Sequence, residues 1–117
     1  MERKFKIQFL DEANEFLNSL DEKVREKVIY NIWKSQIVTD KELFKKLQDE
    51  IWEFRTLFKK SHIRLFAFWD KSGTVDKVVV ANHGIIKKTG KTPKGEIEKA
   101  ERIRKEYFEQ KNEAYEN

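Results

Sequence analysis

Two arginines stand among large apolar residues near the middle of the chain, Arg55 in "IWEFRTLF" and Arg64 in "HIRLFAFWD". The pattern of both segments has a period of two, which predicts strands on which each arginine shares a face with bulky neighbours. Such an arginine can be a residue of the sheet margin, packed along its stem with its charged end in water. Two arginines brought together could instead stabilise the charge that develops on a reacting phosphate.

The connection that follows these predicted strands is strongly basic. The segment "HGIIKKTGKTPKG" contains Lys87, Lys88, Lys91 and Lys94, just before an expected helix. A basic connection is often only a solvated loop, but residues 55–94 carry ten Lys and Arg against two Asp, a net charge of +8. Such a patch favours a polyanion, either nucleic acid or an acidic protein segment, and a helix start also favours anions. Composition does not distinguish these two partners.

Glu53 and His83 are side chains near these cations that could transfer protons. Glu53 is two positions before Arg55 on the same predicted face, where it can be a plain ion-pair partner, a general base or the group that orients Arg55. His83, at the end of a predicted strand, can be a hydrogen-bonded structural residue or a proton shuttle. We interpret His62 as a turn residue. Since the chain has two histidines and no cysteine, we expect no metal centre.

Several reaction types lose support because their motifs are absent. The sequence has no glycine-rich phosphate loop, nucleophile elbow or dinucleotide fingerprint, so nucleotide hydrolysis, acyl transfer and a bound cofactor are not expected. The residues present suit RNA cleavage, in which the ribose 2′-hydroxyl attacks the adjacent phosphate and the protein supplies charge and proton transfer, without a nucleophile or a metal. A desolvated lysine beside other cations has a lowered pKa and could act as the acid or base.

A short series of helices and strands must position these residues. The periodicity predicts a strand at 3–10, helices at 11–20 and 21–37, strands at 51–58, 61–70 and 75–85, and a final helix with Thr92 as N-cap and Pro93 as its first residue. Residues 39–49 could add a turn of helix. We therefore expect an α+β fold of order β-α-α-β-β-β-α, with a helical hairpin on one face of a small, mainly antiparallel sheet.

Length and composition set the class of protein. The 117 residues suit a single domain, 1–117, and the 13% aromatic content supplies a core despite 39% charged residues and a mean hydropathy of -0.82. Without cysteine the chain lacks the disulfides of small secreted domains. It also has no apolar run typical of a signal peptide or a membrane span, so the expected location is the cytoplasm, away from membranes.

The order of motifs resembles a known family. "FKKLQDEIWEFRT", "HIRLFAFWD" and "VVVANHGIIKKTGKTPKGEIEKAERIRKEYF" are similar to the HigB-like branch of the RelE/ParE superfamily of toxins from bacterial type II toxin-antitoxin systems, over residues 44–108. The RelE-like fold agrees with the expected order of elements. One position departs from the branch, which commonly has Phe or another bulky residue where this chain has Ile85. Stacking of a base at that position is therefore not expected.

The resemblance implies a messenger RNA interferase, an endoribonuclease that cuts messages while they are translated on the ribosome. It also implies a cognate antitoxin, which neutralises the toxin in a hetero-oligomeric complex. Carried over by position, Arg64 and Lys88 would contact the scissile phosphate. Flanking phosphates or ribosomal RNA would be bound by Arg55, Lys87, Lys91 and Lys94, whereas His83, Glu53 and Tyr107 would be the candidates for proton transfer.

Two alternatives remain open at this point. A ParE-like protein of the same superfamily would poison DNA gyrase by protein contact and would cleave nothing. A small basic domain could also bind RNA or an acidic protein without any catalysis. Loss of toxicity and of message cleavage on changing Arg64 or Lys88, with folding intact, would favour the interferase over both.

Overall fold

The computed structural model describes residues 2–73 and 77–116, and its strands form one five-stranded mixed sheet of order β1-β5-β4-β3-β2. Strand β1 is parallel to β5, and all other neighbours are antiparallel. The elements are β1 (Lys6–Phe9), α1 (Asp11–Ser19), α2 (Glu22–Ser35), β2 (Phe44–Gln48), β3 (Ile51–Phe58), β4 (Ser61–Asp70), β5 (Val78–Lys87) and α3 (Lys94–Glu116).

The predicted order of elements is wrong in one place. Residues 44–48, which were expected to add a helical turn, form the edge strand β2, so the order is β-α-α-β-β-β-β-α and the sheet has five strands. Phe44 and Leu47 are three positions apart, a spacing that suggests one face of a helix. In the strand they lie on opposite faces instead, each in a different core. Stacking of Phe44 on Phe54, with ring centroids 4.4 Å apart, helps to hold β2 against β3.

The expected start of the last strand cannot be compared in full, because positions 75 and 76 lie outside the described residues. The strand β5 begins at Val78 and continues to Lys87, two residues beyond the predicted end. The final helix begins at Lys94, one residue after the predicted start.

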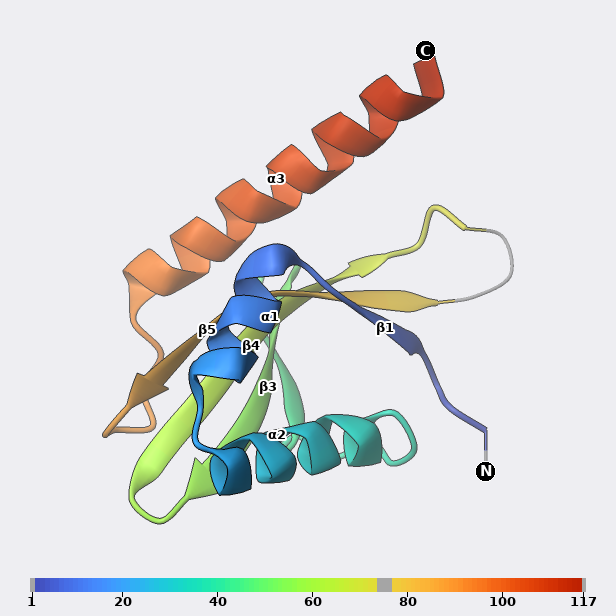
Figure 1. Ribbon diagram of the computed structural model, residues 1–117. Coiled ribbons are helices and arrows are strands. Elements are labelled where there is room, and N and C mark those ends of the chain that lie inside the picture. Colours follow the sequence, from blue (N-terminus) through green and yellow to red (C-terminus); the bar gives the residue numbers. More distant parts are fainter. Residues whose placement is uncertain (1, 74–76, 117) are drawn as a thin grey trace.

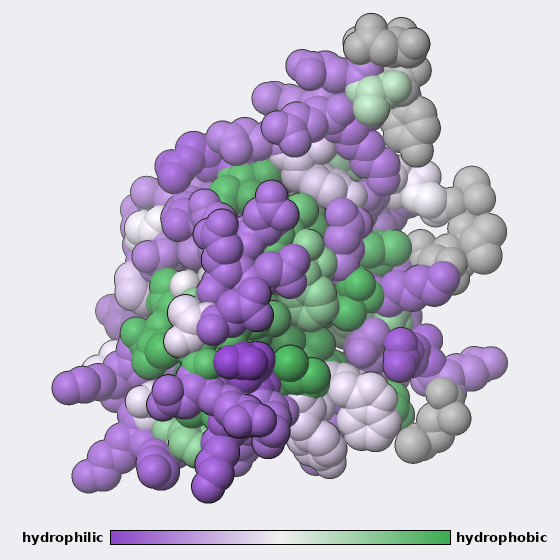
Figure 2. All heavy atoms as spheres, viewed as in Figure 1, coloured by the Kyte–Doolittle hydropathy of each residue, from purple (hydrophilic) through white to green (hydrophobic). Residues whose placement is uncertain are grey.

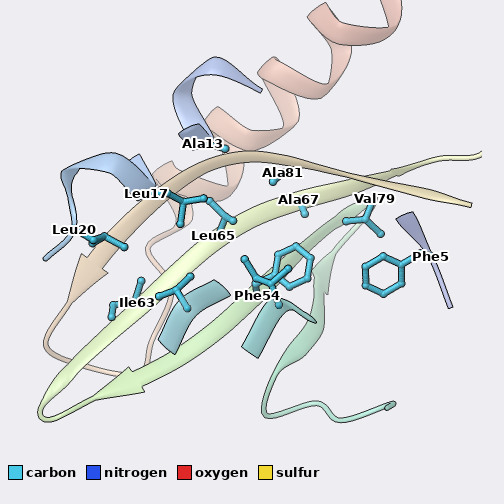
Figure 3. Packing of buried hydrophobic residues seen from close by; sticks show 12 residues of the cluster. Phe5, Ala13, Leu17, Leu20, Phe54, Ile63, Leu65, Ala67, Val79 and Ala81 are labelled. Carbon is cyan, nitrogen blue, oxygen red and sulfur yellow. The ribbon is translucent and has the colours of Figure 1, made fainter. Parts of the chain in front are cut away.

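Helices cover both faces of the sheet (Figure 1). The hairpin of α1 and α2 packs on one face, where Leu17 and Leu20 meet Ile63 and Leu65 of the central strand (Figure 3). Helix α3 covers the other face, where Ala100 packs with residues of three strands, namely Ile51, Phe66, Phe68 and Val80. Because both faces of β4 are covered, all six residues from Ile63 to Phe68 are buried.

One glycine allows the close approach of α1 to the sheet. A Cβ atom on Gly84 would lie 2.1 Å from Cδ2 of Phe16, a separation that requires the Phe16 ring or the helix to shift. Gly84 is thus required where the ring of Phe16 rests on β5. The same strand carries the candidate site residues His83 and Lys87, so this contact helps to position them.

A β-bulge in β5 changes which side chains face α3. Leu65 pairs with Gly84 and Ala67 pairs with Ala81, so Phe66 lies opposite the two residues between them, Asn82 and His83. Beyond the bulge the alternation is shifted by one residue. As a result Lys87, which pairs with His62, lies on the face covered by α3.

The surface in Figure 2 is polar along α3, with apolar atoms beneath the helix and between the elements. Within residues 2–73 and 77–116, no helix combines the length and the apolar character that a membrane span requires.

Candidate functional site

A carboxylate between two guanidinium groups forms the centre of the candidate site. In the antiparallel pair of β3 and β4, Arg55 and Arg64 are direct partners. Glu53 Oε2 lies 3.6 Å from Arg55 Nε, and Glu53 Oε1 lies 3.5 Å from Arg64 Nε. The side chains of Glu53 and Arg64 are each 3% exposed, whereas that of Arg55 is 21% exposed. Glu53 therefore neutralises two neighbouring cations that would otherwise repel each other in a buried place.

The basic loop closes on this centre through Thr92. The Thr92 hydroxyl donates a hydrogen bond to Glu53 Oε1 at 3.0 Å, and it accepts one from Lys87 Nζ, also at 3.0 Å. Lys87 Nζ donates a second bond to the carbonyl oxygen of Gly90, at 3.1 Å. Thr92 was predicted to cap the final helix, but its hydroxyl ties the loop to β3 instead. We refer to Glu53, Arg55, Arg64, Lys87 and Thr92 as the arginine cluster.

The cluster shifts the titration of its own lysine. Burial lowers the pKa of the Lys87 ammonium, the positive charge of Arg64 lowers it further, and Glu53 acts in the opposite direction. Burial also lowers the pKa of Arg64, again against the effect of Glu53, although a guanidinium stays protonated. Lys87 is thus the cluster cation whose charge can change during a reaction.

The two arginines keep unused hydrogen-bonding capacity. Within the described part of the chain, Nε of Arg55 and Nε of Arg64 are buried and have no hydrogen-bond partner. The other nitrogens of Arg64 contact the carbonyl of Ile63 at 3.2 Å and Nδ1 of His62 at 3.3 Å. His62, interpreted from the sequence as a turn residue, therefore belongs to β4 and touches the cluster. Both Nε atoms face the carboxylate of Glu53, at 3.6 Å and 3.5 Å, so an incoming anion would reach Arg55 through the exposed part of its side chain.

His83 holds the start of α3 and is not joined to the arginine cluster. Its ring nitrogens lie 3.0 Å from Asn82 Oδ1 and 3.0 Å from Glu96 Oε2, and its ring stacks on Phe66. Asn82 Nδ2 donates in turn to the carbonyl of Ala100 in α3. Burial lowers the pKa of His83, while the bond to Glu96 opposes that effect. These contacts fix the first turns of α3, directly after the loop that carries Thr92.

The remaining sequence candidates lie apart from one another. Lys88, Lys91 and Lys94 are exposed, at successive points from the end of β5 to the start of α3. The Tyr107 hydroxyl donates to Asp70 Oδ2 at 2.5 Å, at the opposite end of β4 from Arg64. Ile85 pairs with Arg64 and packs in the core under α3. Of the adjacent lysines, the structure brings Lys87 and not Lys88 into the cluster.

A cleft opens beside the cluster, with a volume of about 310 Å³. Its lining includes Glu53 and Arg55 of β3, Lys91 of the basic loop, and Lys45 and Lys46 of β2. Lys45 and Lys46 were not among the predicted site residues, because the segment that carries them was expected to be helical. In the described ranges, no group of three His, Asp or Glu side chains is arranged to hold a metal ion.

The comparison with protein families decides the affiliation of the chain. The family model for phage-derived Gp49-like proteins (DUF891) matches residues 15–105. The chain belongs to the Gp49-like family. This Gp49-like family is RelE-like and is associated with toxin-antitoxin systems. The expected affiliation with toxin-antitoxin proteins is thereby confirmed at the level of the family. No curated protein and no solved structure matched the chain.

The part of this Gp49-like chain that matches the family contains the whole candidate site. The matched range runs from within α1 to the middle of α3. It includes the arginine cluster, the basic loop and the lysines of β2. Strand β1 and the last turns of α3, which hold no cluster residue, lie outside the match.

Proposed function

We propose that this Gp49-like protein is the toxin of a type II toxin-antitoxin system, in the HigB-like branch, and that it cleaves messenger RNA without a metal ion. The observation that carries the proposal is the arginine cluster at the floor of a cationic cleft. A phosphate entering the cleft would meet Arg55 directly and Lys87 nearby. The family association supports the toxin role and a cognate antitoxin as partner.

In the proposed reaction the ribose 2′-oxygen attacks the adjacent phosphorus atom, and the bond from phosphorus to the 5′-oxygen of the next nucleotide breaks. The products are a 2′,3′-cyclic phosphate and a 5′-hydroxyl. The 2′-hydroxyl proton passes to solvent, and the leaving 5′-oxygen takes a proton from the Lys87 ammonium. Because its pKa is lowered, Lys87 is a better proton donor near neutral pH than an ordinary lysine.

The arginines act by charge in this proposal. Negative charge accumulates on the phosphate oxygens in the transition state, and cations already in place stabilise it without reorganisation. Arg55 is partly exposed at the cleft and can contact the phosphate as the molecule stands. Arg64 is buried, so a phosphate reaches it only when the contact between Thr92 and Glu53 opens.

Glu53 and His83 have positioning roles in the same proposal. Glu53 contacts both guanidinium groups and Thr92, and so orients the cations without serving as the base. His83 acts through Glu96, by fixing the start of α3 and with it the end of the basic loop. Lys88, Lys91 and Lys94 are exposed and would bind flanking phosphates or ribosomal RNA if cleavage takes place on a translating ribosome in the cytoplasm.

The test is induced expression in a bacterial host, with growth followed and the 5′ ends of cellular messages mapped. The wild type should arrest growth and produce new 5′ ends inside translated frames. Arg55→Ala and Lys87→Ala should each reduce cleavage about 100-fold or more, the usual effect of losing one group that stabilises the transition state. Lys88→Ala removes the same charge one residue away and should reduce cleavage far less.

A control variant and two outcomes complete the test. Lys27→Ala, on the exposed side of α2, should behave as the wild type. Growth arrest without new 5′ ends would contradict the interferase proposal and would indicate a target such as DNA gyrase. Equal cleavage by the wild type and by Lys87→Ala would exclude Lys87 as the proton donor.

A further inference from the structure

One side of the cleft includes a lysine on the edge strand of the sheet. Lys45 and Lys46 are both exposed on β2 and both border the cleft. Lys46 pairs with Trp52, whose ring contacts Phe44 and Trp69 on the face of the helical hairpin, so the side chain of Lys46 leaves the strand on that face. Lys45 is the direct partner of Glu53 in the pairing of β2 with β3. Directly opposite residues on antiparallel strands have Cα atoms about 5 Å apart, so Lys45 lies one strand spacing from the arginine cluster.

The charge that a ligand meets in this cleft is mainly positive. The ionisable residues that line the cleft are Lys45, Lys46, Arg55, Lys91 and Glu53. The side chain of Glu53 is only 3% exposed, and its oxygens already face two arginines and the Thr92 hydroxyl. One carboxylate does not balance four cations, and the excess of positive charge favours an anionic chain over a neutral ligand.

The shape and lining favour an extended strand over a helix. A helix that binds in a groove places several apolar side chains in a row of apolar sites. Among the residues that line the cleft, the aliphatic side chains are those of Leu47 and Ile97. A volume of about 310 Å³ is at the lower end for ligand sites, which suits one nucleotide at a time and not a helix of protein.

We propose that Lys45 binds the phosphate next to the scissile one, so that single-stranded RNA enters the site along the edge of β2. The inference rests on the proposed RNA substrate, and it adds a binding surface that the cleavage chemistry does not require. Lys45 shares the face of Glu53 and holds the strand in register with the arginine cluster. Its loss weakens RNA binding without removing any group that acts on the reacting atoms.

The test measures binding separately from cleavage. Fluorescence anisotropy is recorded with a labelled 2′-O-methyl RNA of about 12 nucleotides, which has no free 2′-hydroxyl for the attack and stays intact. Since each phosphate contact to a single strand contributes about 0.7 to the salt slope, the variant Lys45→Gln should bind with a slope smaller by about 0.7. The loss of affinity relative to the wild type should become about 2.6-fold smaller when the salt is raised from about 50 to about 200 mM.

The matched control is the variant Lys27→Gln. It makes the same change of charge at an exposed lysine of α2, a helix that packs on the other face of the sheet. This control should retain the affinity and the salt slope of the wild type. Thermal unfolding of both variants checks that the exposed substitutions leave the fold intact.

Each remaining outcome decides the question. Equal RNA binding by the wild type and the β2 variant, or no RNA binding by the wild type, would overturn the proposal. Loss of binding to a polyglutamate peptide, with RNA binding unchanged, would assign the surface to an acidic protein and would overturn it as well. A failure of the proposed cleavage function would give a different result. The wild type would then bind the 2′-O-methyl RNA with the expected dependence on the β2 lysine, but it would leave an RNA with free 2′-hydroxyl groups uncut.

Discussion

At the scale of single residues, Glu53 explains how two arginines can face each other inside the protein. Arg55 and Arg64 are direct partners across β3 and β4, and Glu53 lies within 3.6 Å of a nitrogen on each. Removing one member of a buried ion pair leaves an uncompensated charge and is strongly destabilising. The carboxylate is therefore a condition for the cationic site as well as a part of it.

We expect Glu53→Gln to lower the free energy of unfolding by about 3 kcal/mol, because two guanidinium groups then remain without a counter-charge. Urea unfolding followed by circular dichroism measures this change. Glu26→Gln, an equal change at an exposed position of α2, should cost less than about 0.5 kcal/mol. Identical unfolding of wild type and Glu53→Gln would show that the arginines do not depend on the carboxylate.

Lys87 and Lys88 offer a second comparison, since adjacent lysines have different surroundings. Burial and the charge of Arg64 lower the pKa of Lys87. In a titration followed by NMR of ¹³C-labelled lysine side chains, the Lys87 signal should therefore lose its proton at a lower pH than an ordinary lysine does. Lys87→Arg assigns the signal by removing it. A Lys87 signal that titrates at the ordinary lysine pKa would refute the lowered pKa and weaken the case for Lys87 as the proton donor.

At the scale of elements, the contact between α1 and β5 depends on the absence of a side chain at Gly84. The ring of Phe16 occupies the place where a Cβ atom would be, and it lies directly over the strand that carries His83 and Lys87. The β-bulge at Asn82 and His83 is a second feature of this strand, and it places the side chain of Lys87 on the face covered by α3. Small features of β5 thus connect the helical hairpin to the site.

We expect Gly84→Ala to lower the free energy of unfolding by about 2 kcal/mol, as is usual when extra atoms are forced into a packed contact. Gly95→Ala is the matched control, because a Cβ atom there meets nothing within 4 Å, and alanine should stabilise the first turn of α3 slightly. Thermal and urea unfolding of the two variants should thus shift in opposite directions. A neutral Gly84→Ala would mean that α1 moves away from β5 at little cost.

At the scale of the whole molecule, a group of hydrogen bonds centred on Asp70 holds α3 to the sheet, far from the candidate site. Asp70 Oδ2 accepts hydrogen bonds from Tyr107 at 2.5 Å and from Lys111 at 2.6 Å, while Oδ1 accepts from the backbone and hydroxyl of Ser72. Burial by itself raises the pKa of Asp70, but these bonds outweigh it and hold the pKa well below the usual range. The hydrogen bonds of Asp70 and the contacts of His83 therefore hold two separate parts of α3 against the sheet.

The lowered pKa of Asp70 predicts sensitivity to acid. Its contribution to stability is fully present above the ordinary aspartate pKa of about 4 and is lost as the pH falls through the lower pKa of the folded state. Asp70→Asn should lower the free energy of unfolding by about 2 kcal/mol at neutral pH, and by less as the pH falls through this window. Melting curves at several pH values measure this; Glu109→Gln, an exposed change on α3, is the control. An Asp70→Asn effect that is constant with pH would contradict the titration.

Much of the local structure followed from periodicity. The two helices of the hairpin and strands β3 and β4 have patterns with a clear period, and they occur close to the expected positions. Strand β2 did not follow, because Phe44 and Leu47 serve two different cores and their spacing imitates a helix. The prediction of order β-α-α-β-β-β-α was wrong at this strand. For the same reason Lys45 and Lys46, which β2 carries, were not predicted to lie at the cleft.

The types of residue needed for a cationic site, and the order of motifs typical of toxin-antitoxin proteins, are properties of the sequence alone. Local alternation was also enough to place Glu53 with Arg55, since both belong to one strand. Tertiary structure decided the rest. Simple alternation from Val80 would turn Lys88 toward α3, but the bulge shifts the phase by one and selects Lys87. A bulge depends on pairing with another strand, and the cleft depends on an edge strand and a loop distant in sequence, so neither can be read from local periodicity.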